Sequence, residues 1–137
     1  MAPFHLTNKT FLVTGASSGI GRQVAISISQ MGGHAIITGR NEDELRNTHF
    51  TLKGNNNQII VADLLNEKDL NHLVDQIPML DGVVHCAGIV HPQPIKFMSR
   101  KKISDMFQIN YEAHVLLTSR IIHQKKLNKH ASFVFIS

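Results

Sequence analysis

The chain has 137 residues and a formal net charge of +4, with 42% of its residues hydrophobic and 18% charged. This length and balance predict one compact domain and exclude a disordered chain. No apolar run approaches the ~20 residues that span a bilayer, and no secretory signal is recognisable, so we expect a cytoplasmic protein without membrane contact. The single cysteine, Cys86, agrees with a reducing compartment.

The charged and histidine side chains point to neither nucleic acid nor metal. Lysines and arginines are scattered rather than gathered into one stripe, and the two densest groups, residues 99–104 and 123–129, fall near predicted helix ends. The nine histidines form no i,i+4 pair and no cluster with cysteine or carboxylate, and His85 and His91 only flank a loop. We therefore expect no metal site and ordinary surface or partly buried histidines.

Short apolar runs alternate with longer segments of helical periodicity. In chain order, we predict strands at residues 10–15, 34–39, 58–63, 82–88 and 132–137, and helices at 19–31, 42–52, 67–77 and 99–126. Asn41, Asn66 and Ser99 stand where each can cap the helix that follows. Because the strands are apolar throughout, they are typical of a parallel sheet covered by helices. The order predicts a single α/β domain, residues 1–137, with a doubly wound parallel sheet and helices on both faces, truncated after the fifth strand.

A glycine-rich turn, TGASSGIG at residues 14–21, joins the first strand to the first helix. In α/β sheets this is where the phosphates of nucleotides bind. Gly15 allows a tight turn, Gly19 lets phosphates approach the backbone, and Gly21 lets the helix pack closely. Ser17 and Ser18 add hydroxyls beside unpaired N–H groups of the first helical turn. The glycine spacing, without the lysine of a P-loop, predicts a dinucleotide, although such a turn alone also occurs without a ligand.

Four motifs in sequence order resemble those of the short-chain dehydrogenase/reductase family, and the resemblance runs from about Leu6 to Ser137. They are TGASSGIG as the cofactor turn, ADL at 62–64 as the adenine-contacting segment, CAG at 86–88 as the counterpart of the family's Asn-Ala-Gly, and IN at 109–110 with its structural asparagine. The resemblance implies a Rossmann-like fold, a nicotinamide cofactor and a small carbonyl or alcohol substrate. It also implies a homo-oligomer, a tetramer or dimer, formed through the helix at 99–126.

The candidate cofactor-binding residues combine the glycine turn with the matched motifs: Gly15, Ser17, Ser18, Gly19, Ile20, Gly21, Arg40, Asp63, Leu64, Cys86, Ala87 and Gly88. Asp63 can accept from the adenine amino group, although a carboxylate there also caps turns. Leu64 would pack on the adenine, and Ala87 and Gly88 leave room for the nicotinamide ribose, although Gly88 also suits a plain turn. Cys86 replaces the family's usual asparagine, and we interpret it as a small buried hydrophobe rather than a catalytic thiol.

The end of the second strand indicates which dinucleotide binds. The sequence there is TGRN, residues 38–41, with no acidic residue and with Arg40 where a basic side chain reaches a 2′-phosphate. NADP(H) is favoured, NAD(H) is the alternative cofactor, and a capping or surface role is the alternative for Arg40. Arg22, within the first turn of the first helix, is predicted to face solvent.

The catalytic pair of the family is missing from these residues. Relatives use a tyrosine, a lysine four residues later and a serine, whereas the only tyrosine here is Tyr111, followed four residues on by Val115. We therefore expect the chain alone to be inactive and to be the N-terminal part of a longer protein whose catalytic serine is Ser137 or the next residue. Asn110, which in the family holds a water behind the lysine, is the catalytic candidate that is present; a local kink or a surface polar residue is its alternative.

Two functions follow from these observations. The first is an NADP(H)-dependent oxidoreductase that acts on a 3-oxoacyl thioester, a sugar or another alcohol. The second is a non-catalytic dinucleotide-binding sensor or interaction module.

Overall fold

The computed structural model describes residues 4–90 and 92–137 and has one parallel sheet at its centre. The elements in chain order are β1 (Thr10–Thr14), α1 (Gly19–Gln30), β2 (His34–Gly39), α2 (Glu42–Thr51), β3 (Gln58–Val61), α3 (Glu67–Gln76), β4 (Leu80–His85), η1 (Ile95–Phe97), α4 (Arg100–Phe107), η2 (Gln108–Glu112), α5 (Ala113–His123) and β5 (Leu127–Phe135). The five strands lie in the order β3-β2-β1-β4-β5, and every neighbouring pair is parallel. The predicted doubly wound α/β fold is confirmed.

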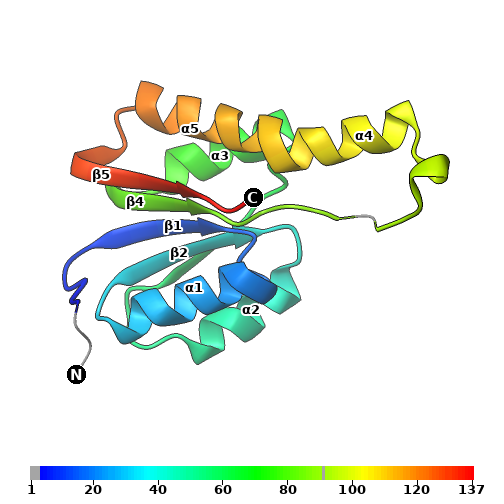
Figure 1. The fold of residues 1–137 in the computed structure, drawn as a ribbon. Helices are drawn as coiled ribbons and strands as arrows, with labels where there is room; N and C mark the ends of the chain where they lie inside the picture. Colours follow the sequence, from blue (N-terminus) through cyan, green and yellow to red (C-terminus); the bar gives the residue numbers. More distant parts are fainter. Residues whose placement is uncertain (1–3, 91) are drawn as a thin grey trace.

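Helices cover both faces of the sheet, α1 and α2 on one and α3 and α5 on the other (Figure 1). Successive residues of a strand point to opposite faces. Leu12 and Ile36 therefore join the core under α3 and α5, whereas Val13 and Ile37 join the core under α1 and α2. This division explains why consecutive residues in the middle of the central strands are apolar.

The predicted helix caps are confirmed. The side chains of Asn41, Asn66 and Ser99 accept hydrogen bonds from the backbone N–H groups of Glu44, Asp69 and Lys102 at the starts of α2, α3 and α4. At the start of α1, by contrast, the N-cap residue Ser18 makes no side-chain capping bond. The start of α1 faces the carboxyl end of the sheet, where a ligand would lie.

The last two strands differ from the prediction. β4 covers Leu80–His85 rather than residues 82–88, and β5 begins at Leu127 rather than at 132. The pairing of β5 with β4 steps from Leu80↔Leu127 to Gly82↔Ser132, so β5 bulges between these pairs, and His130 has a φ of 66° there. The bulged residues are polar and resemble a loop in sequence, which is why the early start of the strand was missed.

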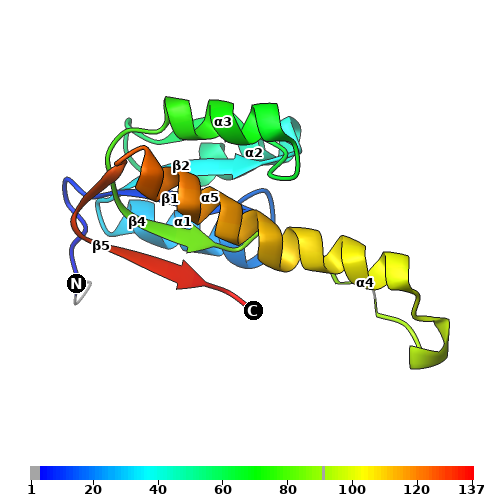
Figure 2. The same cartoon turned by 90° about the horizontal axis from the view of Figure 1, so that it is seen from above.

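The single helix predicted at 99–126 is three consecutive helical segments ending at His123. Between α4 and α5 the backbone widens into the π-helical segment η2, and the helical backbone continues through both junctions. α4 projects beyond the carboxyl ends of the strands (Figure 2). Among residues 4–90 and 92–137, no helix combines the length and apolar character needed to cross a membrane.

Candidate cofactor site

A cavity of about 380 Å³ lies at the carboxyl ends of β1, β2 and β4, between the start of α1 and the segment η2. Among the residues predicted to bind the cofactor, all except Asp63 line it. Thr38, Gly39, Ala62, Ile89 and Ile109 complete the lining. The structure thus brings together residues that the sequence places in four separate segments.

The three glycines of the turn have different reasons to lack a side chain. Gly15 has a φ of 62°, and a Cβ there would lie 2.6 Å from the Ala87 amide nitrogen. A Cβ at Gly21 would lie 2.2 Å from the Gly15 carbonyl oxygen. Gly19, at φ 56°, has nothing within 4 Å of its Cβ position. Gly15 and Gly21 therefore leave room for the protein's own backbone, whereas Gly19 borders open space in the cavity.

The start of α1 favours an anion. The Ser18 side chain makes no capping bond, and no acidic residue stands in the first turn. The N–H groups of a first helical turn have no partner within the helix, and the helix dipole adds partial positive charge there. Ser17, Ser18 and Gly19 line the cavity, so the N–H groups at the start of α1 border the cavity directly.

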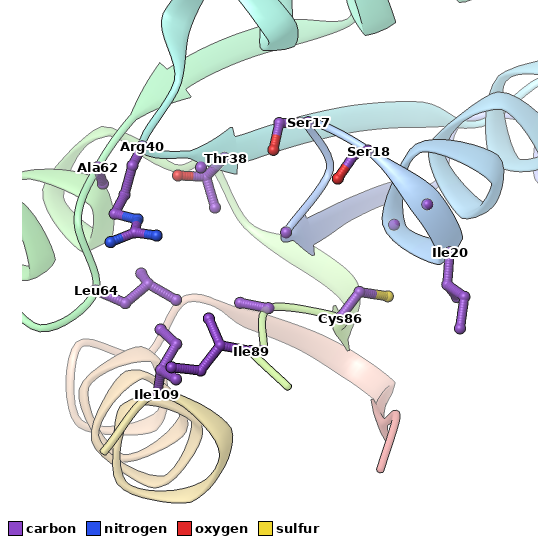
Figure 3. A pocket seen from close by; sticks show the side chains of 16 residues that line it. Ser17, Ser18, Ile20, Thr38, Arg40, Ala62, Leu64, Cys86, Ile89 and Ile109 are labelled. Atoms are coloured by element: carbon purple, nitrogen blue, oxygen red, sulfur yellow. The ribbon is translucent and has the colours of Figure 1, made fainter. Parts of the chain in front are cut away.

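Arg40 and Leu64 lie toward one end of the cavity, and Cys86 and Ile20 lie toward the other (Figure 3). Arg40 also borders a second hollow at the start of α2, together with Ser17, Asn41, Glu42 and Asp43. Glu42 is engaged by Arg46, whose Nη2 lies 2.7 Å from Glu42 Oε1. The exposed Arg40 guanidinium therefore provides positive charge at one end of the lining.

Asp63 organises a turn. Its Oδ1 accepts a hydrogen bond from the Leu65 amide at 3.0 Å, and its own amide donates to Asp69 Oδ2 at 2.8 Å. Leu64, the residue between, is almost fully buried and lines the cavity. The turn places Leu64, and contact between Asp63 and adenine stays a prediction.

Asn110 binds the loop that follows β4. Its Oδ1 accepts from the Ile89 amide at 2.8 Å, and its Nδ2 donates to the Ile89 carbonyl at 2.9 Å. A Cβ at Gly88 would lie 2.9 Å from Asn110 Oδ1, so Gly88 gives room to this side chain. Asn110 sits in the π-helical segment, a distortion that often marks functional sites.

Arg22, which was predicted to face solvent, is partly buried, with 35% of its side chain exposed. Its Nε donates to Thr48 Oγ1 at 2.9 Å, and its Nη2 donates to the Ser17 carbonyl and, at 2.9 Å, to Glu44 Oε2. Its partners on α2 lie more than twenty positions away in sequence, so no local pattern could reveal them.

His85 at the end of β4 and His114 of α5 form a buried pair. Their Nδ1 atoms lie 3.1 Å apart, and His85 Nε2 lies 3.0 Å from Thr118 Oγ1. Burial and the neighbouring His114 lower the pKa of His85 to about 4, and burial also lowers the pKa of His114. The expectation of surface or partly buried histidine was wrong for His85, which is 0% exposed.

Other metal-ligating side chains do not join this pair. Within the described ranges, no group of three or more His, Cys, Asp or Glu side chains could hold a metal ion. His91 lies outside the described residues.

The comparison with known families agrees with this geometry. The model of the family described as short chain dehydrogenase matches residues 9–137. The chain belongs to this family.

Relatives within the family include enzymes and solved structures. The chain is 33% identical over 132 residues to the 3-oxoacyl-[acyl-carrier-protein] reductase FabG of Rickettsia felis, a match that covers 96% of this chain and 54% of that protein. A short chain dehydrogenase of Escherichia coli CFT073 superposes with a TM-score of 0.86 at 32% identity, over 95% of this chain and 61% of that one. A short chain dehydrogenase structure from the same strain, in complex with NADPH, superposes with a TM-score of 0.78 at 33% identity. The match covers 86% of this chain and 53% of that one. The chain thus spans about half the length of its curated relatives.

Cys86, just after β4, is a half-buried neutral side chain. Burial raises the pKa of its thiol, which therefore stays protonated near neutral pH. The amides of Cys86 and Ala87 both donate to Thr14 Oγ1, at 3.1 and 3.2 Å. Thr14 thus ties the end of β4 to β1, a role that the sequence did not reveal because the partners are 72 positions apart.

Proposed function

We propose that the protein is an NADP(H)-dependent oxidoreductase that transfers a hydride between the nicotinamide and a carbonyl or alcohol substrate, and that these residues form its cofactor side. The observation that carries the proposal is the cavity bordered by the open Gly19 and the uncapped start of α1. When bound, the nicotinamide would supply the hydride.

The residues present fit a dinucleotide. Ser17, Ser18 and Gly19 would hold the pyrophosphate with backbone amides and hydroxyls. Leu64 would pack against the adenine, and the main chain of Ala87 and Gly88 would border the nicotinamide ribose. Asn110 would keep Ile89 and Gly88 in place through its paired hydrogen bonds to Ile89.

NADP(H) is proposed over NAD(H) because Arg40 brings positive charge to the hollow beside Ser17 and Asn41. The structural relative in complex with NADPH supports this preference. The carboxylates of Glu42 and Asp43 border the same hollow, so the preference depends on the Arg40 side chain reaching the phosphate.

Cofactor binding is tested by titrating the chain and its variants with NADPH and with NADH. Arg40→Ala should weaken NADPH binding about tenfold or more and leave NADH binding nearly unchanged. Gly19→Val should block both, because a branched side chain fills the open side of the turn. Arg100→Ala, which removes an exposed arginine at the start of α4 and outside the cavity, is the matched control. Equal losses for both cofactors in Arg40→Ala would contradict the NADP(H) preference, and unaltered binding in Gly19→Val would contradict the site.

As substrate we propose a 3-oxoacyl thioester, supported by the similarity to FabG, with a sugar or another alcohol as the alternative. A binding module without catalysis is the second candidate, favoured because the only tyrosine, Tyr111, lacks a lysine four residues later. Tyr111 is exposed and packs against Phe107, outside the cavity lining. NADPH oxidation with a 3-oxoacyl thioester by the protein isolated from its native source would favour the enzyme, and cofactor binding by that protein without turnover of any carbonyl would favour the module.

We further propose that the helix from α4 to α5 mediates a homo-oligomer. Large apolar side chains are exposed along it: Ile103, Phe107, Tyr111, Val115, Leu116 and Ile122. Burial of such side chains against a second copy removes apolar surface from water. Light scattering should give a dimer or tetramer, and a monomer at micromolar concentration would contradict this proposal.

A further inference from the structure

Two side chains outside the cavity hold consecutive carbonyl groups of the glycine turn. Thr48 of α2 is fully buried, and its hydroxyl donates to the Ala16 carbonyl at 2.8 Å. Arg22 donates through Nη2 to the next carbonyl, that of Ser17, and through Nε to Thr48 Oγ1 at 2.9 Å. Glu44 Oε2 fixes the same Arg22 Nη2 at 2.9 Å. The four side-chain contacts form one connected network between α1, α2 and the turn.

The network determines which way two peptide groups of the turn point. In a trans peptide the C=O and N–H bonds are antiparallel, and no cis peptide bond occurs in the described chain. The Ala16 and Ser17 carbonyls point toward Thr48 and Arg22, so the N–H groups of Ser17 and Ser18 point the opposite way. Ser17 and Ser18 line the cavity, whereas Thr48 and Arg22 do not.

We propose that Arg22 and Thr48 are positioning residues that orient the Ser17 and Ser18 amides toward the pyrophosphate of the dinucleotide. The inference rests on the proposed function, because it assigns these amides to the same ligand. Holding donors in place before the ligand arrives reduces the ordering cost of binding. Arg22 suits this task because a planar guanidinium can bond Thr48, Ser17 and Glu44 at once, which a lysine ammonium on a flexible stem does less well.

The network makes a prediction that differs from that for Arg40. Arg40 would contact the 2′-phosphate, so its loss changes the ratio of NADPH to NADH affinity. The pyrophosphate is common to both cofactors, so Arg22→Met should weaken both by a similar factor, about tenfold, with the ratio unchanged. Adenosine 2′-monophosphate lacks the pyrophosphate, and its affinity should not change.

The experiment measures dissociation constants of NADPH, NADH and adenosine 2′-monophosphate for the wild-type chain, Arg22→Met, Arg22→Lys and Thr48→Val, at a temperature where circular dichroism shows all of them folded. Arg22→Lys should lie between wild type and Arg22→Met. The double variant Arg22→Met with Thr48→Val should lose dinucleotide affinity by a smaller factor than the product of the two single fold-changes, because both substitutions interrupt one network. Arg100→Met removes an exposed arginine at the start of α4, away from the cavity, and should leave all three constants unchanged.

Unchanged NADPH affinity in Arg22→Met and Thr48→Val, with wild type binding NADPH, would overturn this inference alone. An equal loss for adenosine 2′-monophosphate would also overturn it, because the effect would then be a general loosening of the fold. If Arg22→Met does not fold, Arg22→Lys and Thr48→Val decide by the same criteria. Failure of the wild-type chain to bind either dinucleotide would overturn the proposed function, and this inference with it.

Discussion

The His85–His114 pair should make the stability of the protein depend on pH between 6.5 and 4. His85 is 0% exposed, and its ring stacks on Phe133 and Phe135 with centroids 6.1 and 4.6 Å away. A hydrogen bond between the two Nδ1 atoms requires one to donate and the other to accept, so the rings cannot both be protonated without losing it. The hydrogen bond therefore disfavours double protonation in the folded state, and burial, which lowers both pKa values, disfavours the first proton as well.

The size of the effect follows from the pKa values of His85. Its pKa is 6.5 in an exposed setting and about 4 in the fold. Below pH 6.5 the unfolded chain binds a proton that the folded chain does not, so the free energy of unfolding falls as pH falls and levels off below pH 4. The loss for His85 is about 2 kcal/mol by pH 5 and about 3 kcal/mol by pH 4. The lowered pKa of His114 acts in the same direction. Against a total stability of about 5–15 kcal/mol, this is a large fraction.

The assay is urea unfolding at intervals from pH 7.5 to 5, a window in which ordinary carboxylates, with pKa values near 4, change charge little. His85→Gln removes the buried imidazole. Between pH 7.5 and 5 its free energy of unfolding should therefore fall less than that of wild type, by at least about 1 kcal/mol. His72→Gln, at an exposed position on α3, is the matched control and should follow wild type. The reasoning would be refuted if the free energy of unfolding of wild type fell by less than about 0.5 kcal/mol between pH 7.5 and 5, or if it fell equally in wild type and His85→Gln.

Three further substitutions test the packing around the cavity. Thr38 Oγ1 is buried without a hydrogen-bond partner in the described chain, so Thr38→Val should raise the free energy of unfolding by about 1 kcal/mol, whereas Thr48→Val, which removes a bonded hydroxyl, should lower it by a similar amount. Destabilisation by Thr38→Val in urea unfolding would show that the hydroxyl has a partner. Gly88→Ala should cost about 1–3 kcal/mol, because its Cβ would lie 2.9 Å from Asn110 Oδ1. In an Asn110→Ala background the same change should cost much less, and an undiminished cost would point to strain elsewhere.

The sequence predicted the fold where local pattern and tertiary environment agree. β1 and β2 are central strands with both faces covered, and the apolar runs at 11–13 and 35–37 are unbroken. Asn41, Asn66 and Ser99 cap helices through bonds to residues only three positions on, which a sequence pattern can reveal. Most of the cavity lining was predictable for the same reason, because its segments at 15–21, 62–64 and 86–89 directly follow strands, whereas Ile109 comes from η2.

The features that the sequence did not reveal depend on residues distant in the chain. Arg22 looked like a surface arginine because Thr48 and Glu44 lie on another helix. His85 looked unremarkable because His114 lies 29 positions away. The π-helical segment at Gln108–Glu112 has the same apolar and polar pattern as an α-helix, and only the bonds of Asn110 to Ile89 place it against the loop after β4. Helical periodicity alone carries no information about such a widening.

Both loops that shape the cavity are held by side chains from other elements. Thr14 of β1 binds the amides of Cys86 and Ala87, Thr48 of α2 binds the Ala16 carbonyl, and Asn110 of η2 binds both backbone groups of Ile89. The partners are separated by 72, 32 and 21 positions. The loops therefore reach their observed shape only once the strands and helices that carry these side chains have assembled. A dinucleotide that binds the shaped loops would stabilise the whole assembled sheet rather than one segment, because it binds the folded state alone.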